Sequence, residues 1–158
     1  MRIILLFSLI LSLTAVEPAP TLSATATALV SEIKVGDIAR LYTRIETTIA
    51  AEPQAKKPLA EALATRIRAA EDIHEHLGDI PLLTTFNQPA LIPPLFERKF
   101  HPGCCCLNAL MDVIAVIGTK AEIAPLRVIA AKLEEDDKLH LNGIIAALES
   151  KDQKTKTP

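Results

Sequence analysis

The most chemically distinctive residues are three consecutive cysteines, Cys104, Cys105 and Cys106, which follow the segment His101-Pro102-Gly103. Thiolates and imidazoles are the usual protein ligands of zinc and of Cu(I), and thiols also pair as disulfides. The chain has 3 cysteines, so pairing two of them in an oxidising compartment leaves one over. The run therefore has three interpretations: burial in the core, a vicinal or intermolecular disulfide, or metal and redox chemistry with His101.

Helix geometry limits the metal interpretation of this cysteine run. Successive residues of an α-helix point about 100° apart, so three adjacent thiols do not converge on one ion if they all lie in a regular helix. In the internal repeat described below, Cys105 is equivalent to Leu139, a position that we expect to face inward. A buried free cysteine behaves as a small apolar side chain. Cys104 is the expected reactive thiol, because N–H groups at a helix N-terminus lower the pKa of a thiol.

A second group of candidate ligands lies earlier in the chain, in the segment Glu71-Asp72-Ile73-His74-Glu75-His76. The spacing of Glu71 and His74 places two ligands on one face of a helix, as in di-iron bundles, and Asp137-Lys138-Leu139-His140 echoes it. A di-metal bundle also needs a second Glu-x-x-His and two more inward glutamates, which the sequence does not supply. The alternative interpretation of this segment is a solvated helix end, where a histidine in the last turn suits the helix dipole.

Composition and motifs exclude several other functions. The net charge is −2, and a basic stripe with interleaved aromatic residues, typical of nucleic-acid binding, is absent from the sequence. The sequence has no nucleophile elbow and no HExxH motif, and its 5 glycines are too few for a nucleotide-binding loop. We therefore expect no nucleic-acid partner, no cofactor and no enzymatic activity, and the leading interpretation assigns no catalytic or metal residue.

The first residues have the pattern of a secretory signal peptide. Arg2 precedes an apolar run from Ile3 to Leu13, and small residues follow it. This run is too short for a membrane-spanning helix, which needs about 20 residues. We therefore expect residues 1–19 to be a removable leader and the mature protein to be secreted or periplasmic, with no stable membrane anchor after cleavage.

The rest of the chain has the composition of one helical domain, residues 20–150, followed by a disordered polar tail, residues 151–158. It is rich in Ala, Leu and Ile and poor in Gly, which favours helix, and no segment alternates long enough to predict a strand. Apolar spacing and cap residues predict about seven helices, with irregular structure at 80–88 and a loop at 98–103. The predicted helices are residues 21–35, 38–51, 57–77, 89–97, 104–117, 122–133 and 137–149.

An internal repeat organises the second half of the chain. Ile92-Pro93-Pro94-Leu95 recurs as Ile123-Ala124-Pro125-Leu126, at an offset of 31 residues (123 − 92). Leu107-Asn108-Ala109-Leu110 recurs as Leu141-Asn142-Gly143-Ile144, at an offset of 34 (141 − 107). A period in the low thirties is typical of stacked helical hairpins, in which each unit covers the apolar face of the next. We predict an all-α fold of antiparallel hairpins stacked as a short α-solenoid.

The segment from Asp112 to Leu133 resembles HEAT-like repeats, particularly the short kind first described in phycobiliprotein lyases. The resemblance rests on Val113-Ile114-Ala115-Val116-Ile117-Gly118 and on Ile123-Ala124-Pro125-Leu126, which opens the next helix. Thr119 and Lys120 replace the acidic residue and the proline that the family has in the turn. The resemblance covers roughly the last 60 residues of the domain. It implies a curved surface that binds protein and does not imply catalysis; bilin lyase activity is disfavoured because an exported chain would not meet that substrate.

The sequence thus favours an exported, non-enzymatic helical-repeat scaffold with an unidentified protein partner. Its binding surface would be lined by the helices from Cys104 and Asp137, and a homodimer through Cys104 or the terminal half-repeat is a further expectation. The alternative is an exported metal- or thiol-redox-active helical bundle. That protein would use Cys104, Cys105 and Cys106 with His101, or Glu71 with His74.

Overall fold

The computed structural model describes residues 21–97, 100 and 102–151. The expected leader, His101 and most of the polar tail lie outside the described residues. Within them the prediction of an all-α fold is confirmed, because the described chain forms seven α-helices and six 3₁₀ helices, with no strand. The α-helices are α1 (Ala24–Val35), α2 (Ile38–Ala51), α3 (Lys56–Ala69), α4 (Leu83–Phe86), α5 (Cys105–Ile117), α6 (Ile123–Ala130) and α7 (Glu135–Ser150). The 3₁₀ helices are η1 (Pro53–Ala55), η2 (Ile73–His76), η3 (Ile80–Leu82), η4 (Pro89–Leu91), η5 (Pro93–Glu97) and η6 (Lys120–Glu122).

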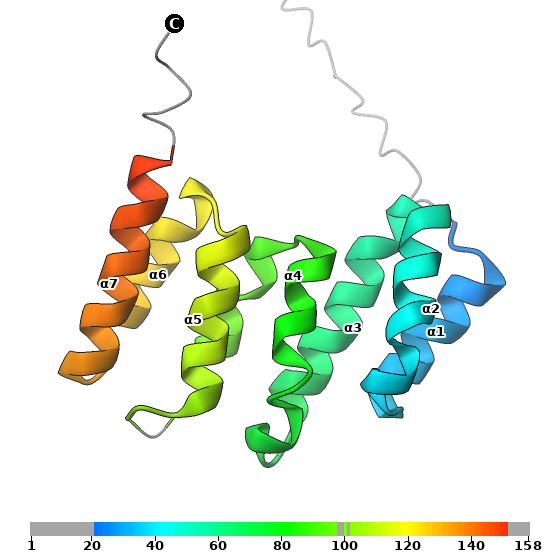
Figure 1. Ribbon diagram of the computed structural model, residues 1–158, viewed down its shortest axis with the longest axis horizontal. Helices are drawn as coiled ribbons and strands as arrows, with labels where there is room; N and C mark the ends of the chain where they lie inside the picture. The colour runs from blue at the N-terminus through cyan, green and yellow to red at the C-terminus, as the bar shows by residue number, and fades with distance from the viewer. Residues whose placement is uncertain (1–20, 98–99, 101, 152–158) are drawn as a thin grey trace, which may run out of the picture.

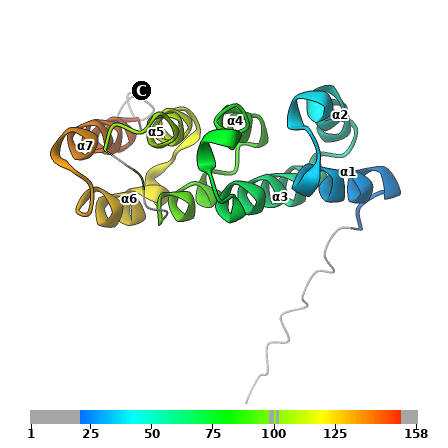
Figure 2. The ribbon, with the colours of Figure 1, turned by 90° about the horizontal axis from the view of Figure 1, so that it is seen from below.

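The helices lie in two rows along the long axis of the molecule (Figures 1 and 2). One row holds α2, α4, α5 and α7, and the other holds α1, α3 and α6 (Figure 2). Contacts run across the rows, as between α6 and α7, and along them, as between α5 and α7. No helix in the part of the chain that the structure describes combines the length and hydropathy needed to cross a membrane.

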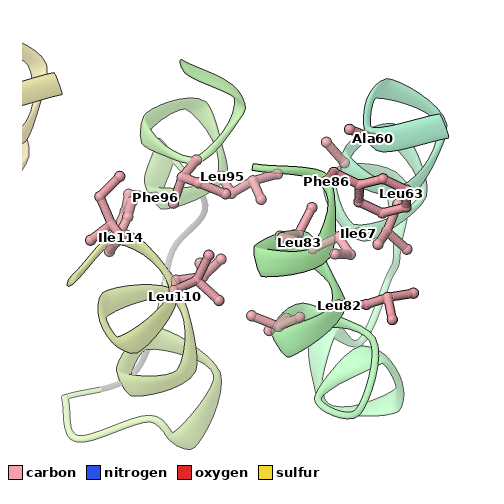
Figure 3. Close-up of a cluster of buried hydrophobic side chains, with 14 of the residues drawn as sticks. Ala60, Leu63, Ile67, Leu82, Leu83, Phe86, Leu95, Phe96, Leu110 and Ile114 are labelled. Atoms are coloured by element: carbon pink, nitrogen blue, oxygen red, sulfur yellow. The ribbon is translucent and has the colours of Figure 1, made fainter. Parts of the chain in front are cut away.

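A continuous apolar core fills the space between the rows. Figure 3 shows its central part, where side chains from α3, α4, η5 and α5 point toward one another. Phe86 and Leu95 are fully buried there. Burial of each such side chain contributes about 1.5–3 kcal/mol, so this core supplies the main stabilising term of the fold. Its labelled members are Ala60, Leu63, Ile67, Leu82, Leu83, Phe86, Leu95, Phe96, Leu110 and Ile114.

Side-chain caps set the beginnings of several elements. The Ser23 hydroxyl accepts the N–H of Ala26 at 3.1 Å and starts α1, and Asp37 caps α2 as its position in the sequence predicts. Thr119 and Glu122 form a capping box at η6, in which the buried Glu122 carboxylate accepts the N–H of Thr119 at 2.8 Å. This reciprocal cap satisfies backbone N–H groups in the turn before α6.

Several predicted boundaries were wrong. The third helix does not run to residue 77: α3 ends at Ala69, because Ala70 adopts an extended ψ of 138°, and the separate element η2 follows. The segment 80–88, predicted to be irregular, contains η3 and α4, and Asn87 ends α4 in the left-handed conformation. The predicted helix 89–97 is two 3₁₀ pieces, η4 and η5, because prolines that lack an N–H interrupt the ladder. The sixth predicted helix shortens to α6, and the seventh begins earlier, at Glu135.

Arg66 ties three elements together. Its guanidinium donates to the carbonyl oxygens of Ile33 and Gly36 at the end of α1, the former at 3.0 Å. It also lies 3.4 Å from the carboxylate of Asp79, which lies 2.8 Å from Nδ1 of His76 in η2. These side chains are largely buried, so their hydrogen bonds fix η2 against α3.

The two repeated segments lie side by side, as predicted. η5 contacts α6, and α5 contacts α7. The offset of 34 residues matches buried positions of α5 to buried positions of α7: Leu107 to Leu141, Leu110 to Ile144, Met111 to Ile145 and Ile114 to Leu148. The same offset also pairs Cys105 with Leu139, but the expected inward orientation of this position was wrong. Both residues are exposed, Leu139 by 74%.

Gly118, which ends α5, has no room for a side chain. A Cβ there would clash with the carbonyl oxygen of Ile114 and lie 3.1 Å from Cδ1 of Leu148. We expect Gly118→Ala to lower the free energy of unfolding by about 1–3 kcal/mol, as overpacking does. Gly143, inside α7, is the matched control, because a Cβ there meets nothing within 4 Å. Gly143→Ala should stabilise by roughly 0.5–1 kcal/mol through helix propensity. Urea unfolding checks both, and equal effects of the two substitutions would contradict the packing described for α5 and α7.

Candidate metal centre

The structure gathers His74 with all three cysteines. One ligand atom from each of His74, Cys104, Cys105 and Cys106 lies within 4.8 Å of the others. Cys104 and Cys106 are buried, whereas Cys105 and His74 are exposed, so the cluster opens to solvent on one side. All three cysteines are free thiols. Residues 30 positions apart in the sequence thus form one group of sulfur and nitrogen donors.

The thiols converge because the helix begins one residue later than predicted. Cys104 is the N-cap residue of α5, with φ −59° and ψ 129°, and Cys105 is the first helical residue. The divergence expected of three successive helical thiols does not apply to this chain, since Cys104 lies outside the helix and follows a different backbone path. Its Sγ lies within 4.8 Å of the other two sulfurs and 3.6 Å from Nε2 of His74 in η2.

A hydrogen bond to a residue of α7 fixes the turn before Cys104. Gly103 has a φ of +67°, a conformation that costs a residue with a side chain about 1–2 kcal/mol. The Gly103 N–H donates to Oδ2 of Asp137 at 3.1 Å. Asp137 is buried in the first turn of α7, where a carboxylate also suits the helix dipole. This interaction connects the last helix of the domain to the start of the cysteine run.

Asp72 orients the imidazole of His74. One carboxylate oxygen, Oδ1, accepts both the backbone N–H and Nδ1–H of His74, each at 2.9 Å. Because a carboxylate only accepts hydrogen bonds, Nδ1 carries the proton and Nε2 is directed to the cluster, 3.6 Å from Sγ of Cys104. The hydrogen bond to Asp72 is the main cause that raises the pKa of His74 above its ordinary value of 6.5.

The surroundings of Cys104 and Cys106 shift the pKa values of their thiols in opposite directions. Burial opposes ionisation of Cys104, but the backbone N–H groups of Leu107 and Cys106, the Cys106 thiol and the His74 imidazole outweigh burial and lower its pKa. Burial and the neighbouring charge of Cys104 raise the pKa of Cys106 to about 12. In the metal-free protein, Cys104 is therefore the more acidic of the two and Cys106 stays protonated.

The other predicted ligands do not join this group. Glu71 is exposed and lies in a bend before η2, so Glu71 and His74 do not share the helix face that a Glu-x-x-His motif needs. His101 lies outside the described residues. Asp137 supports the loop instead of acting as a ligand, and the exposed His140 is not in the cluster.

Sequence reasoning missed the roles of two carboxylates. The segment Asp72-Ile73-His74 carried a signal, because aspartate side chains commonly accept an N–H two residues later in an Asx turn. The contact between Gly103 and Asp137 had no comparable signal, since it joins residues 34 positions apart.

Three thiols and one imidazole form a donor set for thiophilic ions. Zn²⁺ takes this combination in four-coordinate sites, and Cu(I) also prefers soft sulfur ligands. Hard cations such as Mg²⁺ and Ca²⁺ need oxygen ligands, which this cluster does not offer. The arrangement of Asp72 behind His74 matches the carboxylate–histidine–metal support found in many metal sites.

Comparisons with family models, with curated proteins and with solved structures found no match to this chain.

The pair of Asp72 and His74 predicts a measurable titration in the metal-free protein. The pKa of His74 should lie above 6.5, and Asp72→Asn should lower it by removing the main cause of the shift. Since the folded protein favours the imidazolium, the pair stabilises the fold below pH 6.5, and this contribution is lost as pH rises through the folded pKa. NMR titration of the histidine ring protons checks this, with the signal of His140 on α7 as the internal control. An unchanged His74 titration in Asp72→Asn would contradict the assigned hydrogen bond.

Proposed function

We propose that this chain is an exported helical-repeat protein that binds one thiophilic metal ion, Zn²⁺ or Cu(I), at His74, Cys104, Cys105 and Cys106. The observation that carries the proposal is the convergence of four soft donor atoms within 4.8 Å. In a tetrahedral zinc site with bonds to sulfur of about 2.3 Å, neighbouring sulfurs lie about 3.8 Å apart. Closure around an ion therefore needs side-chain movements of roughly 1 Å and no change of fold.

Proton release accompanies binding at this site. Metal ions bind thiolates, so the proton that Cys106 holds in the metal-free protein, where its pKa is about 12, must leave when the ion enters. His74 must also be neutral at Nε2, and its raised pKa extends the pH range over which a proton competes with the metal. The apparent affinity should therefore rise with pH.

Titration with Co²⁺, a spectroscopic substitute for zinc, followed by displacement with Zn²⁺ tests the proposal. The reduced protein should bind one ion per chain and show thiolate charge-transfer absorption. Cys104→Ser, Cys106→Ser and His74→Ala should each weaken binding strongly, and Asp72→Asn should weaken it by about 10–100-fold as a supporting group.

His140→Ala is the matched control, because this exposed histidine lies outside the cluster. It should bind the ion as the unchanged protein does. Failure of the folded, reduced protein to bind one ion would refute the proposal. So would equal losses in His74→Ala and His140→Ala.

Protein binding by a HEAT-like α-solenoid is the second candidate function. The arrangement of the helices in two rows and the matching buried positions of α5 and α7 support the solenoid interpretation. In the described chain no further helix covers the outer side of α7, where Leu139 is 74% exposed. Ala146 follows Leu139 on the same helical stripe and is also exposed. This small residue allows close approach of another helix, and we propose α7 of a second copy as the partner.

Sedimentation velocity over a range of concentrations tests this dimer. The reduced protein should self-associate, and Leu139→Glu should abolish association by placing a charge in the apolar contact. Val116→Glu is the control, because Val116 is also an exposed apolar residue, 67% exposed, but belongs to α5 and not to α7. A reduced protein that stays monomeric at high micromolar concentration would refute a dimer through α7.

A further inference from the structure

We propose that Cys104 and Cys106 are also a dithiol that small disulfides oxidise to an intrachain disulfide, so that oxidation and metal binding exclude each other. The competition with metal rests on the proposed function, whereas formation of the disulfide does not. The starting observation is that the sulfur atoms of the cluster lie within 4.8 Å of one another while all three cysteines are free.

Backbone geometry selects the pair. Neighbouring Cα atoms joined by a trans peptide are about 3.8 Å apart, below the range of about 4.4–6.8 Å that disulfides span. Cys105 therefore cannot pair with either neighbour without distortion of the chain, and the described residues contain no cis peptide. Cys104 and Cys106 flank one helical residue, and helix radius and rise place such Cα atoms about 5.4 Å apart. This separation is in the middle of the permitted range.

The cluster is open enough for small reagents. Cys104 is 9% exposed, and beside it lie the exposed side chains of His74 and Cys105. The Nε2 atom of His74, 3.6 Å from Sγ of Cys104, is placed to take the proton of that thiol. Cys106 is fully buried, which makes Cys104 the member of the pair that an oxidant reaches first.

The reaction balances with one small disulfide, RSSR, as the oxidant. The Cys104 thiolate attacks one sulfur of RSSR, forming a mixed disulfide and releasing the first thiolate, RS⁻. Cys106 then loses its proton and attacks Sγ of Cys104, which forms the intrachain disulfide and releases the second RS⁻. The two protein thiols are oxidised by two electrons, and RSSR is reduced to two thiols once each RS⁻ takes up one of the two protons.

Formation of this bond removes two of the four proposed metal ligands and leaves Cys105 and His74 alone. Conversely, a bound ion holds both sulfurs in coordination and keeps them from attacking the oxidant. In an oxidising compartment the site would therefore be loaded only while it is reduced.

The test is treatment of the reduced, metal-free protein with oxidised glutathione, followed by alkylation of the remaining thiols and peptide mass mapping. The expected product has a bond between Cys104 and Cys106 and an alkylated Cys105. The variant Cys105→Ser should form the same bond, whereas Cys104→Ser and Cys106→Ser should accumulate only mixed disulfides. Circular dichroism establishes that each variant is folded. A vicinal bond to Cys105, or a product modified only at Cys105, would overturn the assignment.

A second experiment tests the competition with metal by repeating the oxidation in the presence of free Zn²⁺ at ten times its dissociation constant. Oxidation should slow by about tenfold, because about one site in eleven remains empty. Zinc that binds in the titration but leaves the oxidation rate unchanged would refute mutual exclusion. Formation of the disulfide in a protein that binds no metal would refute the metal proposal and leave the dithiol assignment in place.

Discussion

The cysteine cluster depends on the hydrogen bond from the Gly103 N–H to the buried carboxylate of Asp137. This contact holds the left-handed turn at Gly103, and that turn leaves Cys104 just outside α5. Three adjacent thiols then face a common point, which a helix beginning one residue earlier would prevent. A local backbone conformation, stabilised by a helix that is distant in the sequence, therefore brings the three thiols together.

The helical scaffold places the imidazole opposite these thiols. The early end of α3 frees the chain to form η2, and Arg66 with Asp79 fixes that element against α3 and the end of α1. Asp72 then sets the orientation of His74. The two halves of the site thus come from separate contacts, one among the N-terminal helices and one between the loop before α5 and α7. The packing of the helical units determines the distance between donors.

The sequence predicted the parts of the fold that depend on local pattern. Apolar spacing and capping residues such as Asp37 located most helices, and the repeat offsets predicted that α5 and α7 are neighbours. The predicted helix boundaries were wrong where the local backbone conformation overrides the apolar spacing. At Ala70, for example, the chain leaves the helix although the apolar spacing continues. The cysteines and His74 were both recognised as candidate ligands, but their meeting depends on tertiary packing. The spacing of apolar residues along a sequence does not give the distance in space between residues 30 positions apart.

X-ray absorption spectroscopy of the zinc-loaded protein is the most direct test of the metal site, because it identifies the ligands of the ion. The loaded site should hold a four-coordinate ion with about three sulfur ligands near 2.3 Å and one nitrogen ligand near 2.0 Å. Replacement of Cys104 by serine should reduce the sulfur count by one. A shell made only of oxygen and nitrogen ligands, or a sulfur count that is unchanged by that replacement, would contradict metal binding at this cysteine cluster.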